Sequence, residues 1–119
     1  MVGLPATAGT TTDGLGAAAL KKLELARALA TQPRLLLADE SLNGLDRAEM
    51  EQAAEMLQRI RTEKSITIVW VEHIMGVLMR VVDRVVVLDH GEVIFAGKPA
   101  DAQADARVIE VYLGAEAIA

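Results

Sequence analysis

Two adjacent acids directly follow a short apolar run, and they are the sharpest chemical signal in the chain. Residues 35–38 are Leu-Leu-Leu-Ala, and Asp39 and Glu40 come next. An apolar strand of this kind places its carboxylates at the carboxyl edge of a sheet, where open α/β folds bind ligands. There Asp39 can hold a hydrated Mg²⁺ through water, and Glu40 can orient a water against a phosphoryl group. The alternative is that the two acids simply end a strand.

A turn and a histidine add to this signal. The turn follows Glu40, contains a glycine and ends on Asp46, and His73 ends the next apolar run. If the two runs are neighbouring strands, His73 lies beside Glu40 at the same edge. An imidazole there can donate to a phosphate oxygen and hold the attacking water. The alternative for a lone histidine at a strand end is a structural role.

The elements that must position these residues follow a doubly wound α/β pattern. We expect helices over 17–31, 46–62 and 73–81, strands over 34–39, 65–71, 83–88 and 92–97, and a helical region from 99 to about 114. Asp46 and Glu49 match a capping box at the start of the second helix. A turn with His90 and Gly91 joins the last two strands as an antiparallel hairpin, and His90 is interpreted as structural.

Composition excludes several classes of protein. The 119 residues, 52% hydrophobic and 3% aromatic, fit one small domain with no apolar run near the ~18 residues of a membrane span. Without cysteine there is no disulfide or thiolate zinc site, and two histidines cannot form a three-histidine metal site. A net charge of −5 with few aromatics disfavours nucleic acid as a partner.

The chain divides into three parts by composition. Residues 1–14 form a loose lead-in rich in glycine, threonine and alanine, residues 15–114 carry the periodic patterns, and residues 115–119 form a tail. Residues 14–19 also match the dinucleotide fingerprint Gly-x-Gly-x-x-Gly/Ala. That fingerprint requires a buried strand immediately before it, and none is expected there. We therefore interpret this segment as an alanine-rich helix start.

Several of these motifs together resemble ATP-binding cassette (ABC) ATPases. Residues 35–46 look like the Walker B strand, catalytic glutamate and D-loop of that family, and His73 looks like its switch histidine. Residues 15–29 occupy the place of the signature motif and its helix. Within the family, residues 71–73 and 108–114 resemble the ATPase subunits of branched-chain amino acid importers. The resemblance covers about residues 15–114.

The resemblance implies a partial P-loop NTPase fold, with a mostly parallel sheet and a C-terminal antiparallel hairpin. In the complete protein, ATP binds between two ATPase subunits and drives import through transmembrane subunits, at the cytoplasmic side of the cell membrane. By resemblance, Asp39 positions Mg²⁺ through water and Glu40 polarises the attacking water. His73 contacts the γ-phosphate, and Asp46 communicates across the dimer.

The chain also departs from the family pattern. No Walker A loop, Gly-x-x-Gly-x-Gly-Lys-Ser/Thr, is present in the printed sequence, and neither is the strand that precedes it. Where the family has Leu-Ser-Gly-Gly-Gln, residues 15–19 read Leu-Gly-Ala-Ala-Ala. The backbone amides of Gly16, Ala17 and Ala18 can still favour an anion, but the serine hydroxyl is lost. Ser41 stands where the family commonly has proline.

The aromatic residues do not supply an adenine platform. Trp70, Phe95 and Tyr112 lie in segments typical of a core or a tail. We expect no ATPase activity from this chain alone, because the phosphate cradle is absent. The alternative to an ATPase portion is an inactive interaction module that keeps the fold.

The missing Walker A strand also bears on the sheet. In the family that strand lies between those corresponding to residues 65–71 and 83–88. Without it, both strands have unpaired backbone groups. We expect direct pairing of the two strands or association with another chain, and hence a homo- or hetero-oligomer.

Overall fold

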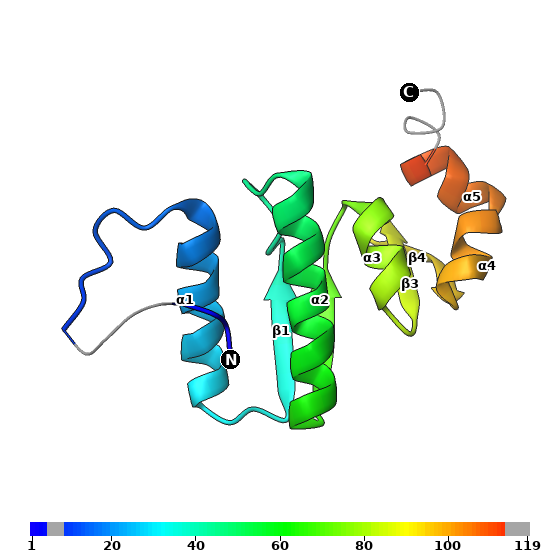
Figure 1. The fold of residues 1–119 in the computed structure, drawn as a ribbon. Helices are drawn as coiled ribbons and strands as arrows, with labels where there is room; N and C mark the ends of the chain where they lie inside the picture. The colour runs from blue at the N-terminus through cyan, green and yellow to red at the C-terminus, as the bar shows by residue number, and fades with distance from the viewer. Residues whose placement is uncertain (5–8, 114–119) are drawn as a thin grey trace. The chain divides into compact units, whose positions relative to one another are not determined.

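The computed structural model describes residues 1–4 and 9–113, which form two compact units (Figure 1). The first unit is Met1–Glu72 and the second begins at His73. Each unit has a hydrophobic core of its own. Within the described residues, no helix combines the length and the apolar character needed to cross a membrane.

The first unit contains two helices and a pair of parallel strands. Its elements, in chain order, are α1 (Ala17–Ala30), β1 (Leu35–Asp39), α2 (Arg47–Lys64) and β2 (Thr67–Val71). β1 and β2 pair in parallel, with Leu35 opposite Thr67 and Asp39 opposite Val71. The two apolar runs are therefore neighbouring strands, which the sequence alone gives only as a condition.

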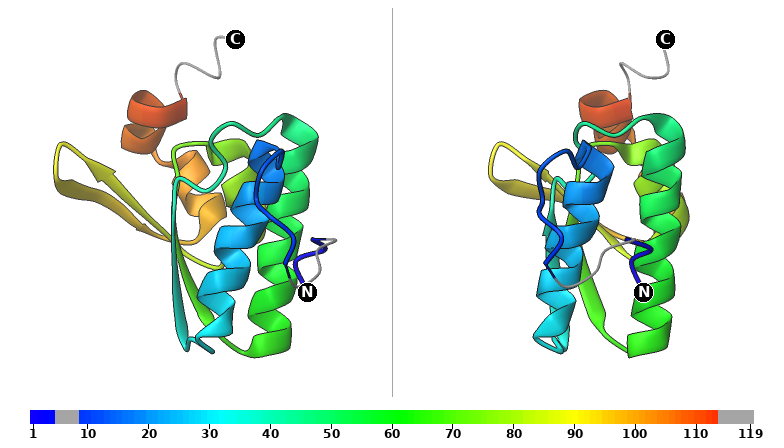
Figure 2. Two further views of the ribbon diagram at one scale, coloured as in Figure 1. Left: turned by 90° about the vertical axis from the view of Figure 1, so that its left-hand side faces the viewer. Right: turned by 60° about the vertical axis from the view of Figure 1, so that its left-hand side comes forward.

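Both helices of the first unit lie on the same side of the β1–β2 sheet (Figure 2). Side chains alternate between the faces of a strand, so every second residue of β1 and β2 meets these helices. The buried residues of this core are Leu36, Leu57, Ile60 and Ile66. The other face carries exposed apolar side chains, namely Leu35, Leu37, Val69 and Val71. Leu37 is 69% exposed, so this face has no cover within the described part of the first unit.

Local signals set the ends of α2. Asp46 Oδ1 accepts from the Glu49 amide at 2.8 Å, and Glu49 Oε2 accepts from the Asp46 amide at 2.9 Å. This reciprocal pair is the predicted capping box, which satisfies two amides at the helix start. Ser65 ends the helix in a left-handed conformation with φ of 51°. Because that conformation is incompatible with a strand, β2 begins at Thr67 and not at the expected residue 65.

The second unit joins a hairpin to short helices. Its elements, in chain order, are α3 (Met75–Val81), β3 (Val85–Asp89), β4 (Glu92–Gly97), α4 (Pro99–Ala104), α5 (Ala106–Val108) and a π-helical turn (Ile109–Leu113). Its buried core is Met75, Met79, Val85, Val87, Ala102 and Val108. The expected helical region from residue 99 is thus broken into short pieces. Residues 115–119, the predicted tail, lie outside the described residues.

A two-residue turn closes the β3–β4 hairpin. His90 and Gly91 have φ of 47° and 82°, the positive values that a type I′ turn requires at both central positions. The His90 ring lies 2.9 Å from Asp89 Oδ1 within the same turn. The hydroxyl of Tyr112 donates to the carbonyl of Leu88, which fixes the π-helical turn to β3. His90 thus forms part of the expected turn, and its interpretation as structural stays a prediction.

Of the two expected outcomes for the second and third strands, direct pairing is not seen among the described residues, and association with another chain stays a prediction. β2 belongs to a two-stranded sheet with β1, and β3 belongs to a separate two-stranded sheet with β4. β3 pairs with β4 across the two-residue His90-Gly91 turn. The sheet that includes β2 therefore stays open beside that strand within residues 1–4 and 9–113.

Candidate functional site

The 40–46 loop leaves the carboxyl end of β1, where the sequence predicts the reactive acids. The Glu40 amide donates to the Val71 carbonyl at 2.8 Å, which extends the parallel ladder one residue beyond Asp39. Glu40 has φ of 47°, a left-handed conformation that turns the chain out of the strand. A non-glycine residue in this conformation stores strain, which is typical of functional turns.

A neighbour in the loop fixes the direction of the Glu40 carboxylate. Asn43 Nδ2 donates to Glu40 Oε2 at 3.0 Å, and the Asn43 amide lies 3.4 Å from the Glu40 carbonyl. Both residues are exposed. The carboxylate therefore faces solvent in a defined orientation, which is the arrangement that a water-polarising base requires.

Two side chains from the end of β2 hold the next two loop residues. Trp70 Nε1 donates to Ser41 Oγ at 2.9 Å, and the Leu42 amide donates to Glu72 Oε1 at 2.8 Å. Neither contact was foreseen: Trp70 was predicted only as core or tail, and Glu72 only as part of a resemblance. The one available signal was Ser41, which stands where the family commonly has proline. A hydroxyl at that position can accept a hydrogen bond, whereas proline cannot.

The far end of the loop is anchored by burial and by the helix cap. Leu42 is fully buried and Leu45 is 8% exposed, so two side chains of the loop are removed from solvent. Asp46 is exposed and uses one carboxylate oxygen to cap α2. The structure therefore gives Asp46 a local role in ending the loop, and its role across a dimer stays a prediction.

The start of α1 is the second predicted phosphate-contacting segment. Gly16 is the residue before the helix, with φ of −71°, and it offers no side chain to cap the helix. The first turn of α1 contains no acidic residue. Because the first amides of a helix lack intrahelical partners, those of Ala17 and Ala18 suit an anion in principle. Their contact with a phosphate stays a prediction.

His73 lies in the second unit. It is exposed and comes two residues before α3 begins at Met75. It is not part of that helix, although the sequence predicted a helix from residue 73. Its expected position beside Glu40 stays a prediction, because the two residues belong to different units.

The aromatic residues pack as the sequence predicts. Trp70 packs against the core of the first unit, and Phe95 and Tyr112 pack against the core of the second. That these rings supply no platform for a nucleobase stays a prediction.

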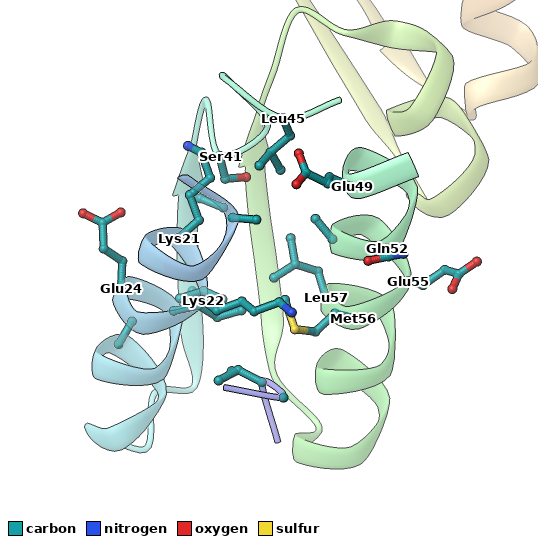
Figure 3. A pocket seen from close by; sticks show the side chains of 18 of the residues that line it. Lys21, Lys22, Glu24, Ser41, Leu45, Glu49, Gln52, Glu55, Met56 and Leu57 are labelled. Carbon is teal, nitrogen blue, oxygen red and sulfur yellow. The ribbon is translucent and has the colours of Figure 1, made fainter. Parts of the chain in front are cut away.

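A pocket of about 830 Å³ lies between α1 and α2 in the first unit (Figure 3). Lys21 and Lys22 line it from α1, whereas Glu49 and Glu55 line it from α2. It extends to residues at the end of β1, including Asp39. The lining of this pocket combines positively charged, negatively charged and apolar side chains, and it therefore indicates no single class of ligand.

The described residues contain no cluster of three or more histidine, cysteine, aspartate or glutamate side chains that could hold a metal ion. Asp39 is a single exposed carboxylate at the end of a parallel strand. A lone carboxylate fits a hydrated Mg²⁺ held through water, because Mg²⁺ keeps several of its waters in such sites. It does not fit a cation ligated by protein groups alone.

Comparisons with known proteins agree on one family. The family model described as "Branched-chain amino acid ATP-binding cassette transporter" matches residues 92–118. The high-affinity branched-chain amino acid transport ATP-binding protein BraF of Pseudomonas aeruginosa is 33% identical over 94 residues. The methionine import ATP-binding protein MetN of Caulobacter vibrioides is 42% identical over 96 residues. These matches cover 79% and 81% of this chain, but only 37% and 29% of the relatives.

Solved structures show the same fold. An ATP-binding cassette of an ABC transporter, in its ADP conformation, aligns with a TM-score of 0.76 and 24% identity, over 85% of this chain and 41% of that one. The cbiO1 protein of Clostridium perfringens, part of the cbiONQ transporter complex, aligns with a TM-score of 0.74 and 29% identity. That alignment covers 82% of this chain and 39% of cbiO1. The chain therefore spans well under half of each of these structures.

Proposed function

Since the chain belongs to the ABC transporter ATPases, as a C-terminal portion of their ATPase domain, we propose that it supplies the hydrolytic part of an amino acid importer's ATPase. The observation that carries this proposal is the 40–46 loop. It leaves the carboxyl end of a parallel strand pair and holds the Glu40 carboxylate in one direction through Asn43. The proposed reaction is hydrolysis of ATP, coupled to import through transmembrane subunits.

Each of the proposed reactive residues has a role that suits its chemistry. Glu40 orients and polarises the attacking water, because its carboxylate is exposed and directed by Asn43. His73 donates to the γ-phosphate. Asp46 communicates with a second ATPase subunit. The amides of Gly16, Ala17 and Ala18 face the phosphate bound by that second subunit.

Mg²⁺ fits the proposal in a limited way. Asp39 would hold the ion through water, as a single exposed carboxylate at the strand end can do. When bound, Mg²⁺ would neutralise charge that develops on the phosphate oxygens. The groups that cradle the phosphates directly belong to the Walker A loop, and none of the 119 printed residues forms that motif. We therefore propose that ATP and Mg²⁺ bind only together with a Walker A portion.

The transported solute is an amino acid in this proposal. The match of residues 92–118 to a branched-chain amino acid transporter model favours branched-chain substrates. The identity to a methionine import protein keeps methionine as the competing solute. The ATPase acts in the cytoplasm, at the inner face of the membrane, where its transmembrane partners are reached.

A second candidate is an interaction module without catalysis. One observation favours it: the open face of the β1–β2 sheet is apolar. An exposed apolar sheet face supports association with another polypeptide, in line with the expected homo- or hetero-oligomer. In this second case the chain has the same fold and binds the same partners, but it does not hydrolyse ATP.

Mixing the chain with a polypeptide that carries the Walker A portion of the family distinguishes the two candidates. We expect no Mg²⁺-dependent ATP turnover from the chain alone, and turnover when the Walker A portion is added. A Walker A polypeptide whose lysine is replaced by alanine is the matched control. Formation of a complex without turnover supports the interaction module. Turnover by the chain alone would contradict the proposed dependence on the missing portion.

A further inference from the structure

The 40–46 loop is held mainly from outside itself. Its first three residues are each bonded to the end of β2, by one backbone bond and two side-chain bonds. The side chains responsible are Trp70 and Glu72, which lie 29 and 30 residues along the chain from the groups they contact. These two residues therefore connect the loop to the sheet independently of β1.

Strand alternation explains how both side chains reach the loop. Residues two apart in a strand point to the same face, so Ile68, Trp70 and Glu72 form one row. Ile68 and Trp70 pack against the core of the first unit, which lies on the face that the helices cover. The loop meets the carboxyl end of this row. Trp70 thus combines packing along its ring with a bond from its indole N–H.

The burial of the Glu72 carboxylate lowers the stability of the fold, which is unusual for a purely structural contact. One of its oxygens accepts from the Leu42 amide, whereas Oε2 is buried without a hydrogen-bond partner among the described residues. A buried carboxylate oxygen that lacks a partner destabilises the fold. Local costs of this kind are expected where a residue is kept for function.

We propose that Trp70 and Glu72 are positioning residues for Glu40, and this inference rests on the proposed ATPase function. Glu72 holds the backbone amide of Leu42, and Trp70 holds the side-chain hydroxyl of Ser41, the residue next to Glu40. With these two residues held, Asn43 directs the Glu40 carboxylate from within the same loop. A small displacement of a base from its water lowers the rate strongly, so these anchors act on turnover without touching ATP.

Amide hydrogen exchange tests the Glu72 anchor in the chain itself. Replacing Glu72 with alanine should speed exchange of the Leu42 amide by about tenfold to a hundredfold, because a bond to a charged acceptor is lost. Glu72→Gln keeps a side-chain acceptor and should retain most of the protection. Glu63→Ala removes an exposed glutamate of α2 and is the matched control. Amides in the middle of α2 should keep their protection in all three variants.

Two results would overturn the anchor. One is a Leu42 amide that exchanges at the same rate in Glu72→Ala and in the unchanged chain. The other is an equal loss of protection in α2, which would mean that Glu72 only contributes to global stability.

The Ser41–Trp70 bond can be removed from either end. Ser41→Ala deletes the acceptor with little change of volume, and Trp70→Phe deletes the indole N–H but keeps an aromatic ring. Each variant should speed exchange in the loop by about twofold to tenfold. The double variant should match the single ones, because both remove the same bond. Fully additive effects would contradict the proposed contact.

Turnover then links the anchors to Glu40. In the chain mixed with a Walker A portion, Glu72→Ala and Ser41→Ala should each lower kcat by about tenfold and leave KM within about twofold. An unchanged kcat would overturn the positioning role. If the unchanged chain gives no turnover, the proposed function fails, and the exchange data still decide whether Trp70 and Glu72 hold the loop.

Discussion

The 40–46 loop and the start of α1 are both predicted to face a nucleotide, and the structure builds them differently. The loop is tied by side chains at its beginning, in its middle and at its end. The start of α1 has a glycine before the helix and no side-chain cap. In this chain the 40–46 loop is held by several side-chain hydrogen bonds, whereas the start of α1 has no side-chain cap.

This difference has a simple physical origin. A catalytic carboxylate must point in one direction, so contacts that fix its backbone increase its effect. Backbone amides at a helix start are already oriented by the helix and need fewer supporting side chains. Substitutions in the loop should therefore have large effects, and substitutions at the start of α1 small ones.

The largest effect on stability is expected at the buried residue of the loop. Leu42 is fully buried, so Leu42→Ala should lower the free energy of unfolding by about 2–5 kcal/mol. Leu20→Ala in α1 is the matched control, because Leu20 is 43% exposed and should cost less than about 1 kcal/mol. Urea denaturation measures both variants. Equal losses in the free energy of unfolding would mean that the 40–46 loop and α1 are stabilised equally by the two leucines.

An intermediate effect is expected at the end of the loop. Asp46→Ala removes the acceptor for the Glu49 amide and should destabilise the chain by about 0.5–2 kcal/mol. Asp13→Ala, an exposed acid in the lead-in, should leave the free energy of unfolding unchanged. Thermal unfolding compares the two variants. An Asp46→Ala variant as stable as the unchanged chain would show that the capping box contributes nothing.

The smallest effect is expected at the start of α1. Gly16→Ser restores the serine of the family signature and adds a hydroxyl that can cap the helix, a gain of a few tenths of a kcal/mol. A side chain fits, because nothing lies within 4 Å of the added Cβ and φ is −71°. Gly14→Ser is the control, since its φ of 82° makes a side chain strained. A marked destabilisation by Gly16→Ser would show that the start of α1 does not tolerate a side chain at residue 16.

Local patterns made much of this structure predictable from the sequence. The capping box of Asp46 and Glu49 and the His90-Gly91 turn depend on residues close together in the chain, and both were predicted. The pairing of β1 with β2 joins two apolar runs separated by a helix, an arrangement that the sequence suggests as a condition. In each case the partner lies nearby or is the obvious neighbour.

The long-range contacts were not predictable. No spacing rule links Trp70 to Ser41, because their bond exists only once β2 lies beside β1. The same holds for Glu72, whose acceptor role depends on where the loop backbone returns. The sequence also does not show which strand edges stay unpaired: β2 and β3 belong to separate sheets among the described residues. The place of His73 beside Glu40 is still a prediction.

The most direct measurement is the turnover of Glu40→Gln. The variant is mixed with a Walker A portion, and its Mg²⁺-dependent ATP hydrolysis is compared with that of the unchanged chain and of Glu63→Gln, an exposed control. We predict that Glu40→Gln loses about 10²–10⁴-fold in kcat, as removal of a general base does, while Glu63→Gln keeps full turnover. Turnover that persists in Glu40→Gln at the level of the control would contradict the assignment of this loop as the hydrolytic element.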